Sequence, residues 1–82
     1  MQVSIRFSAR LAHELGAPRL SLTLPDGSTV GDLVAVLRSD YPRAEGLTVA
    51  LPIVAGQYVA LDRPLAPDSE VALLLPVAGG LD

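Results

Sequence analysis

Apolar and polar residues alternate in two short segments in the first third of the chain. Every second residue is apolar over residues 2–7, and every second residue is a leucine over residues 19–24. Successive side chains of a β-strand point to opposite faces, so this two-residue period predicts two half-buried strands. The second strand leads into Pro25-Asp26-Gly27-Ser28, a run of residues that favours a turn.

The segment between these strands has helical spacing. Leu11 and Leu15 are four positions apart, which places them on one face of a helix over residues 9–15. Ser8 can cap the start of this helix, and Gly16 can end it. We therefore expect a short helix between the first two strands.

A longer helix is predicted after the turn. Thr29-Val30-Gly31-Asp32 fits a capping box in which an aspartate replaces the usual Glu or Gln. From Val30, apolar residues recur at the i, i+3, i+4 and i+7 spacing of a helix that packs on a sheet. The residue before Pro42 disfavours the helical conformation, so the main helix is expected over about residues 30–39.

The second half of the chain has the character of strands and turns. An apolar, β-branched run over residues 48–54 is interrupted by Pro52, which predicts a strand exposed at one edge. Ala55-Gly56 predicts a tight hairpin to a strand over residues 57–60. Residues 70–75 are expected to form the last strand.

The order of elements indicates an α+β fold. One mixed sheet of four to five strands, with one main helix packed across it, forms a roll of this class. The first and last strands are apolar and are expected at the centre of the sheet; if they pair in parallel, the main helix must lie in the crossover between them. The expected domain covers residues 1–78, followed by a flexible tail over residues 79–82. The expected core contains Val3, Ile5, Leu22, Leu33, Leu37 and Val71.

Length and composition indicate one globular domain. The chain has 82 residues, of which 50% are hydrophobic and 18% charged. No apolar run approaches the ~20 residues of a membrane span, and the first residues lack the basic and apolar regions of a signal peptide. We therefore expect a cytoplasmic protein with no membrane partner.

Composition also excludes several kinds of chemistry. The chain has no cysteine, and its single histidine, His13, lacks the partners of a metal site or a catalytic triad. The net charge is −3 and the six cationic residues, all arginines, are scattered, so nucleic acid is not an expected partner. Without lysine, the chain has no side-chain amine that could accept an isopeptide bond.

The most informative segment is the last one, Gly79-Gly80-Leu81-Asp82, which follows an apolar strand and Pro76. Glycines usually serve backbone geometry, but no further element follows for these two to connect. A tail without Cβ atoms can pass through a narrow channel and bring a backbone carboxylate into the active site of another protein. The chemistry is therefore expected at the carboxyl terminus and not in a pocket.

Five segments of the chain carry a resemblance to a known family. They are Val3–Leu11, His13–Gly16, Leu24–Val30, Leu37–Pro42 and the end of the chain, which is the most specific and consists of Asp68–Ala72 followed by Pro76-Val77-Ala78-Gly79-Gly80. Together they resemble the MoaD/ThiS group of ubiquitin-like β-grasp sulfur carriers, to which the small subunit of molybdopterin synthase belongs. The resemblance covers essentially the whole chain and implies a β-grasp roll.

The resemblance implies a carrier and not an enzyme. An E1-like enzyme uses ATP to adenylate the terminal glycine, and sulfide from a separate donor displaces AMP to leave a thiocarboxylate. Gly80 then carries the reacting carbonyl, Gly79 keeps the tail slim, and the large subunit of a synthase receives the sulfur. The carrier itself holds no metal or permanent cofactor.

The resemblance also implies that partner enzymes dock on the sheet near the last strand. Alternation sends Leu74 to the face opposite Leu73 and Leu75. An apolar surface there would suit a partner protein. The expected docking residues are Phe7, Leu74, Pro76, Val77 and Ala78.

The chain departs from this pattern at its end. Leu81 and Asp82 lie beyond Gly80, whereas the standard carrier ends at glycine. We expect this dipeptide to be removed, by a metalloprotease of the JAMM type.

Molybdopterin synthesis is the leading assignment within the group, and three alternatives stay open. The same domain could serve as the sulfur carrier in the synthesis of cysteine, thiamine or a secondary metabolite, or in tRNA thiolation, because the acceptor enzyme decides the product. A ubiquitin-like modifier would join Gly80 to lysines of other proteins. A β-grasp interaction module would have a tail that never reacts.

Overall fold

The computed structural model describes residues 1–76 and places eight elements in them. In chain order they are β1 (Gln2–Phe7), α1 (Ala9–Leu15), β2 (Arg19–Thr23), α2 (Val30–Asp40), a 3₁₀ helix η1 (Glu45–Thr48), β3 (Leu51–Val54), β4 (Gln57–Tyr58) and β5 (Glu70–Leu74). The two α-helices and the first and last strands lie within one residue of their predicted bounds. The element η1 was not predicted, and it takes the start of the segment expected to be a strand from residue 48.

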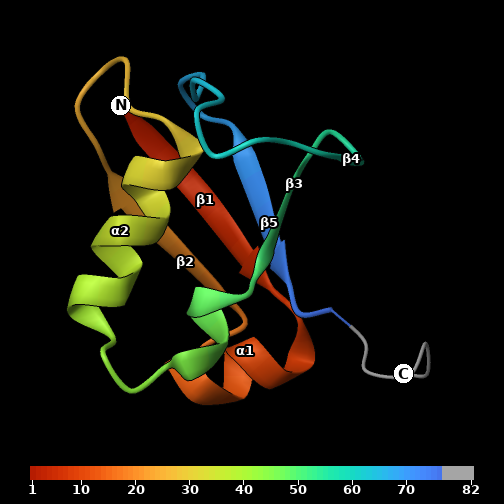
Figure 1. Ribbon diagram of the computed structural model, residues 1–82. Coiled ribbons are helices and arrows are strands. Elements are labelled where there is room, and N and C mark those ends of the chain that lie inside the picture. The colour runs from red at the N-terminus through yellow and green to blue at the C-terminus, as the bar shows by residue number, and fades with distance from the viewer. Residues whose placement is uncertain (77–82) are drawn as a thin grey trace.

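The strands form one mixed sheet with α2 across one face (Figure 1). Their order is β2-β1-β5-β3-β4, in which β1 and β5 are parallel and the other neighbours are antiparallel. The first and last strands therefore lie side by side, and α2 lies in the connection between them, as predicted. This is the α+β roll of the ubiquitin-like β-grasp fold.

The core lies between α2 and the inner face of β1 and β5. On α2, Val30, Leu33 and Leu37 are fully buried, which confirms the helical stripe. The predicted core residues are likewise fully buried, except for Leu22, which is only partly buried. Leu22 lies on β2, one of the two edge strands, which has a neighbour on one side only.

The starts of the two helices differ from each other. The predicted capping box is confirmed: the Asp32 amide donates to Thr29 Oγ1 at 3.2 Å, and the Thr29 amide donates to Asp32 Oδ2 at 2.9 Å. Ser8 holds the predicted N-cap position of α1, but its hydroxyl makes no capping hydrogen bond. Ser8 Oγ is buried and has no partner among residues 1–76.

A tight hairpin joins β3 to the short edge strand β4. Ala55 and Gly56 have φ angles of 52° and 79°, the positive values of a two-residue type I′ turn. The strand β4 has two residues and pairs only with Ile53 and Val54. The prediction of an exposed edge is wrong for β3, which lies between β5 and β4; Pro52 pairs with Leu73 of β5, and its carbonyl oxygen accepts from the Val59 amide at 3.2 Å.

The helices of the described part of the chain are short. None of those within residues 1–76 has the length and apolar character needed to cross a membrane.

Candidate functional site

The last strand carries the chain to the predicted reactive segment. The strand β5 runs between β1 and β3, ends at Leu74, and leaves the sheet beside the start of α1 (Figure 1). Pro76, an expected docking residue, is exposed and is the last described residue. The other predicted tail residues, Val77, Ala78, Gly79 and Gly80 with the extension Leu81-Asp82, lie outside the described residues.

Two contacts hold the end of β5 in place. The Ser8 amide donates to the Leu73 carbonyl oxygen at 3.0 Å, which ties the start of α1 to the strand. Leu75 is partly buried and packs against the core. A Cβ atom at Gly46 would lie 3.1 Å from Leu75 Cδ2 and 2.9 Å from Leu11 Cδ2, so η1 approaches this position closely because residue 46 is glycine.

The support from η1 is the part of the site that sequence reasoning missed. The Gly46 amide donates to Glu14 Oε1 at 2.9 Å, so η1 is joined to α1 as well. Ala44 and Leu47 are both buried and three positions apart, which is the period of a 3₁₀ turn. That spacing was the available signal, but it involves only two residues, and they lie just before the strand-like run that begins at residue 48.

The sheet face that points away from α2 is called the open face here. Alternation along β5 sends Val71 and Leu73 to the core and Leu74 to the open face. The register places Leu51 opposite Leu74, and Ile53 opposite Ala72 and Tyr58. We call these five residues the apolar half of the open face; Leu51 is 36% exposed and Tyr58 is 69% exposed.

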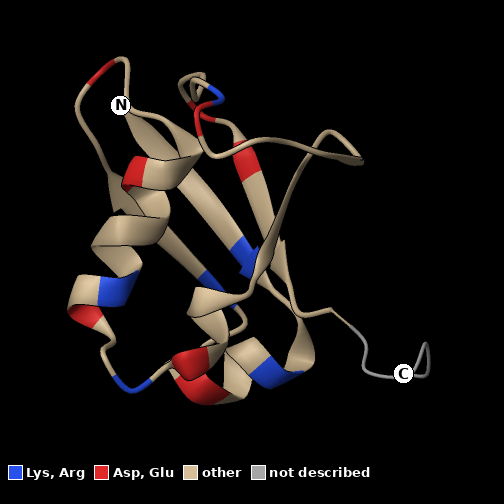
Figure 2. Cartoon of the chain, in the orientation of Figure 1, with Lys and Arg blue, Asp and Glu red and all other residues tan. Residues whose placement is uncertain are grey.

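The rest of the open face is polar. Arg6 and Arg19 lie opposite each other on β1 and β2, and Arg19 Nη1 forms an ion pair with Glu70 Oε2 at 3.0 Å. Gln2 Nε2 donates to Ser21 Oγ at 2.9 Å. Figure 2 shows the contrast, because β1, β2 and β5 carry charged residues whereas β3 and β4 carry none.

A depression of about 420 Å³ lies where the two halves meet. Arg6 lines it from the polar half, Ile53 and Ala72 line it from the apolar half, and the hairpin turn closes one side. Glu70 lines it as well as Arg6, so the depression places groups of both charges beside an apolar wall.

Phe7 needs a correction as a docking residue. It is 6% exposed and faces the core, because it shares the inner face of β1 with Val3 and Ile5. Its Cα partner on β5 is Leu73, also a core residue. Phe7 is therefore a core residue beside the end of β5, and almost none of its surface is accessible to a partner.

The described residues provide a surface and contain no cluster suited to a metal. No group of three or more His, Cys, Asp or Glu side chains that could hold a metal ion occurs within residues 1–76. His13 is exposed in the last turn of α1.

The family comparison covers nearly the whole chain. The model of the ThiS family matches residues 5–80. The chain therefore belongs to the ThiS family, the β-grasp sulfur carriers related to MoaD, which are small carrier proteins and not catalysts themselves. The match includes Gly79 and Gly80 and ends before Leu81.

Solved structures share the fold at low sequence identity. Small archaeal modifier protein 1 from Haloferax volcanii has a TM-score of 0.83 and 26% identity, and the match covers 98% of this chain and 100% of that one. The protein of the same name from Methanosarcina acetivorans has a TM-score of 0.79 and 22% identity, with 96% of each chain covered. The complex of subunits 1 and 2 of molybdopterin-converting factor from Helicobacter pylori gives a TM-score of 0.71 and 23% identity, covering 98% and 100%. The likenesses below 25% identity show the fold alone.

Proposed function

We propose that this chain is a sulfur carrier for molybdopterin synthesis, with Gly80 as the reacting residue after removal of Leu81-Asp82. The observation that carries the proposal is that the family match runs through both glycines and ends at Gly80. The two residues beyond that point then form a segment to be removed, and a JAMM-type metalloprotease is our candidate for the cleavage. The cytoplasm is the expected location.

The proposed chemistry takes place on the Gly80 carboxylate. One of its oxygens attacks the α-phosphorus of ATP in an E1-like enzyme, and pyrophosphate leaves. Sulfide from a separate donor then attacks the carbonyl carbon, the bond to the adenylate oxygen breaks, and AMP leaves with the electron pair. Activation is needed because a free carboxylate is a poor electrophile, and the partner enzyme that holds the thiocarboxylate gains from proximity.

The partner is proposed to dock on the apolar half of the open face. This surface adjoins the end of β5, so a partner seated there would receive the tail directly. Leu74 and Pro76, together with Val77 and Ala78, are the contact residues we propose. The large subunit of molybdopterin synthase is the proposed acceptor, and the Helicobacter pylori relative, which was solved as a complex of subunits 1 and 2, supports this choice.

The test is the intact mass of the chain isolated from its own host while the pathway is running, with the C-terminal peptide sequenced by fragmentation. We expect a peptide that ends at Gly80 and has sulfur in place of one carboxyl oxygen. Fragmentation is needed because oxidation of Met1 nearly reproduces the mass change. A terminus that keeps Leu81-Asp82 and has no sulfur would contradict the proposal. A chain that ends at Ala78 is the control, since it lacks the reacting residue.

Attachment to other proteins is the second candidate function. It is favoured by the likeness to small archaeal modifier protein 1, which is named as a protein modifier. In this case Gly80 would be joined to amines of target proteins. Conjugates of this chain that survive denaturant and thiol reductant would support attachment, because an isopeptide bond resists both treatments and a thiocarboxylate complex does not.

A further inference from the structure

The strands of the open face carry one uncompensated positive charge. They place three charged side chains there, Arg6 on β1, Arg19 on β2 and Glu70 on β5 (Figure 2). Two positive charges and one negative charge leave this face at +1, although the whole chain has a net charge of −3. The Glu70 carboxylate is already paired, because its Oε2 lies 3.0 Å from Arg19 Nη1. Arg6 forms no ion pair within residues 1–76, so the free charge of this face lies at Arg6.

Ala72 forms the floor of the depression on the open face. It lies on β5 between Arg6 of β1 and Ile53 of β3, which are its Cα partners on either side. Neighbouring strands are about 4.8 Å apart, so these two partners lie about 9–10 Å apart with only a methyl group between them. All three residues line the depression. The row therefore has room for one side chain from outside, between a guanidinium and an aliphatic wall.

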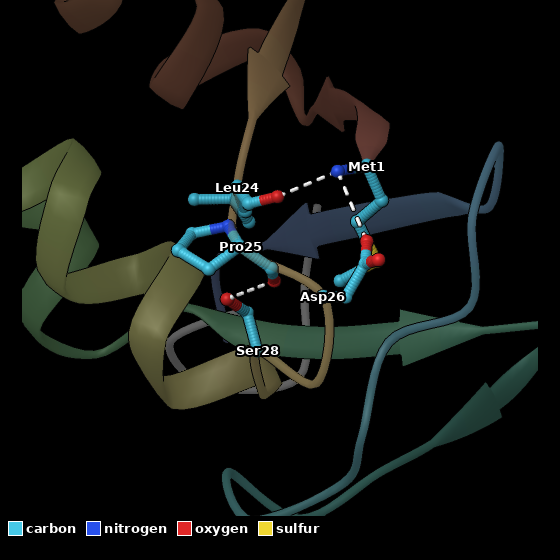
Figure 3. Close-up of polar contacts among 5 residues, drawn as sticks. All are labelled: Met1, Leu24, Pro25, Asp26 and Ser28. Carbon is cyan, nitrogen blue, oxygen red and sulfur yellow. Dashed lines mark hydrogen bonds and ion pairs between the residues drawn. The ribbon is translucent and has the colours of Figure 1, made fainter.

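The pairing of β1 keeps Arg6 on this face. At the start of the strand, the Met1 nitrogen donates to the Leu24 carbonyl oxygen at 2.7 Å and lies 3.3 Å from Asp26 Oδ1 (Figure 3). From there β1 pairs with β2 on one side and with β5 on the other. A slip of one residue would turn every side chain of the strand to the opposite face. The position of Arg6 beside Ala72 is thus fixed by the register of three strands.

A structural role does not explain the charge of Arg6. Its Cα partner on β2 is Arg19, and like charges directly opposite each other destabilise a sheet. Arg6 is also exposed, so it contributes little to the core. A neutral residue would serve the fold at least as well, which indicates that the charge serves binding.

We propose that the partner enzyme inserts an acidic side chain, Asp or Glu, into this depression and pairs its carboxylate with Arg6. This rests on the proposed function, in which a partner docks on the open face. A guanidinium donates two parallel hydrogen bonds to a carboxylate, and the aliphatic part of the same side chain packs on Ala72 and Ile53. Ala72 lies two residues before Leu74 on the same face, so the acidic side chain is next to the proposed docking contact. Arg6 then selects the partner by charge, whereas the apolar half supplies contact area.

The test is titration calorimetry of the full chain with the purified large subunit of molybdopterin synthase from the same host. Arg6→Gln should weaken binding at least about tenfold, and Arg6→Glu should weaken it further because it repels the carboxylate. Arg6→Lys keeps the charge but loses the two parallel hydrogen bonds, so it should recover part of the affinity. The difference between wild type and Arg6→Gln should shrink from about 0.05 M to about 0.5 M salt because of screening.

Two further variants separate charge from shape. Arg38→Gln makes the same charge change on the exposed side of α2, which covers the other face of the sheet, and should bind like wild type (Figure 1). Ala72→Leu fills the depression at constant charge and should weaken binding at least about tenfold. Urea denaturation checks the fold of each variant, and Arg6→Gln should keep at least the wild-type midpoint.

The outcomes separate this inference from the proposed function. Equal affinities of wild type and Arg6→Gln would overturn the inference alone, and so would an equal loss for Arg38→Gln. A loss for Ala72→Leu without one for Arg6→Gln would overturn it as well, because the depression would then take an uncharged side chain. Absence of wild-type binding would overturn the proposed acceptor and this inference with it. Recovery of Arg6→Glu binding by one Asp→Arg or Glu→Arg change in the large subunit would support the pairing and identify the acidic residue.

Discussion

The two faces of the central sheet are built by the same strands and have opposite properties. On β1 and β5, Val3, Ile5, Val71 and Leu73 are fully buried against α2. One residue along, Arg6 lies on the open face, where charged and apolar side chains remain accessible to a partner. The inner face is constrained by packing volume, because interiors are close-packed. The open face is constrained by the chemistry of what binds it. Substitutions on the inner face should therefore lower stability, whereas substitutions on the open face should change partner binding.

The largest effect is expected on the inner face. Leu37 is fully buried in the last turns of α2, and Leu37→Ala should lower the free energy of unfolding by about 2–5 kcal/mol through lost burial and a cavity. Urea denaturation measures this. Ser39→Ala, on the exposed side of the same helix, is the control and should stay within about 0.5 kcal/mol of wild type. An unchanged midpoint for Leu37→Ala would show that the inner face does not govern stability.

An intermediate effect is expected for docking on the open face. Leu74→Glu puts a charge in the apolar half and should weaken partner binding at least about tenfold, or about 1.4 kcal/mol, with the fold intact. Titration calorimetry with a purified synthase large subunit or activating enzyme measures the affinity, and circular dichroism checks the fold. Thr23→Glu makes the same charge change on the polar half of the open face and should bind like wild type. Equal affinities for the two variants would show that the apolar half is not the docking surface.

The smallest effect is expected in the polar half. The ion pair of Arg19 and Glu70 is solvent-exposed on both sides, and such pairs contribute about 0–1 kcal/mol. Arg19→Gln should therefore lower stability by no more than about 0.5 kcal/mol, and about 1 M salt should cancel the difference by screening. Urea denaturation at low and high salt measures both. A loss as large as that of Leu37→Ala would mean that the open face contributes to stability as the inner face does.

The sequence alone determined the elements whose signals are local. The alternation in β1 and β2, the capping box at Thr29 and the stripe on α2 each follow from residues close together in the chain. The resemblance placed the reacting group at Gly80, and the family match includes that residue. The strand, helix and capping-box predictions are confirmed because strand period, helix period and capping depend on neighbours within a few positions. The reacting role of Gly80 stays a prediction.

Only the tertiary structure decided which side chains face a partner and which groups are engaged. Alternation showed that Leu74 and Leu73 point to opposite faces, but the side covered by α2 had to be known before Phe7 could be assigned to the core. The pairing of Met1 with Leu24 and Asp26, and the approach of η1 to the end of β5, join residues more than twenty positions apart. Such contacts depend on how the elements pack, and a pattern read along a single segment contains no information about the segment that will cover it.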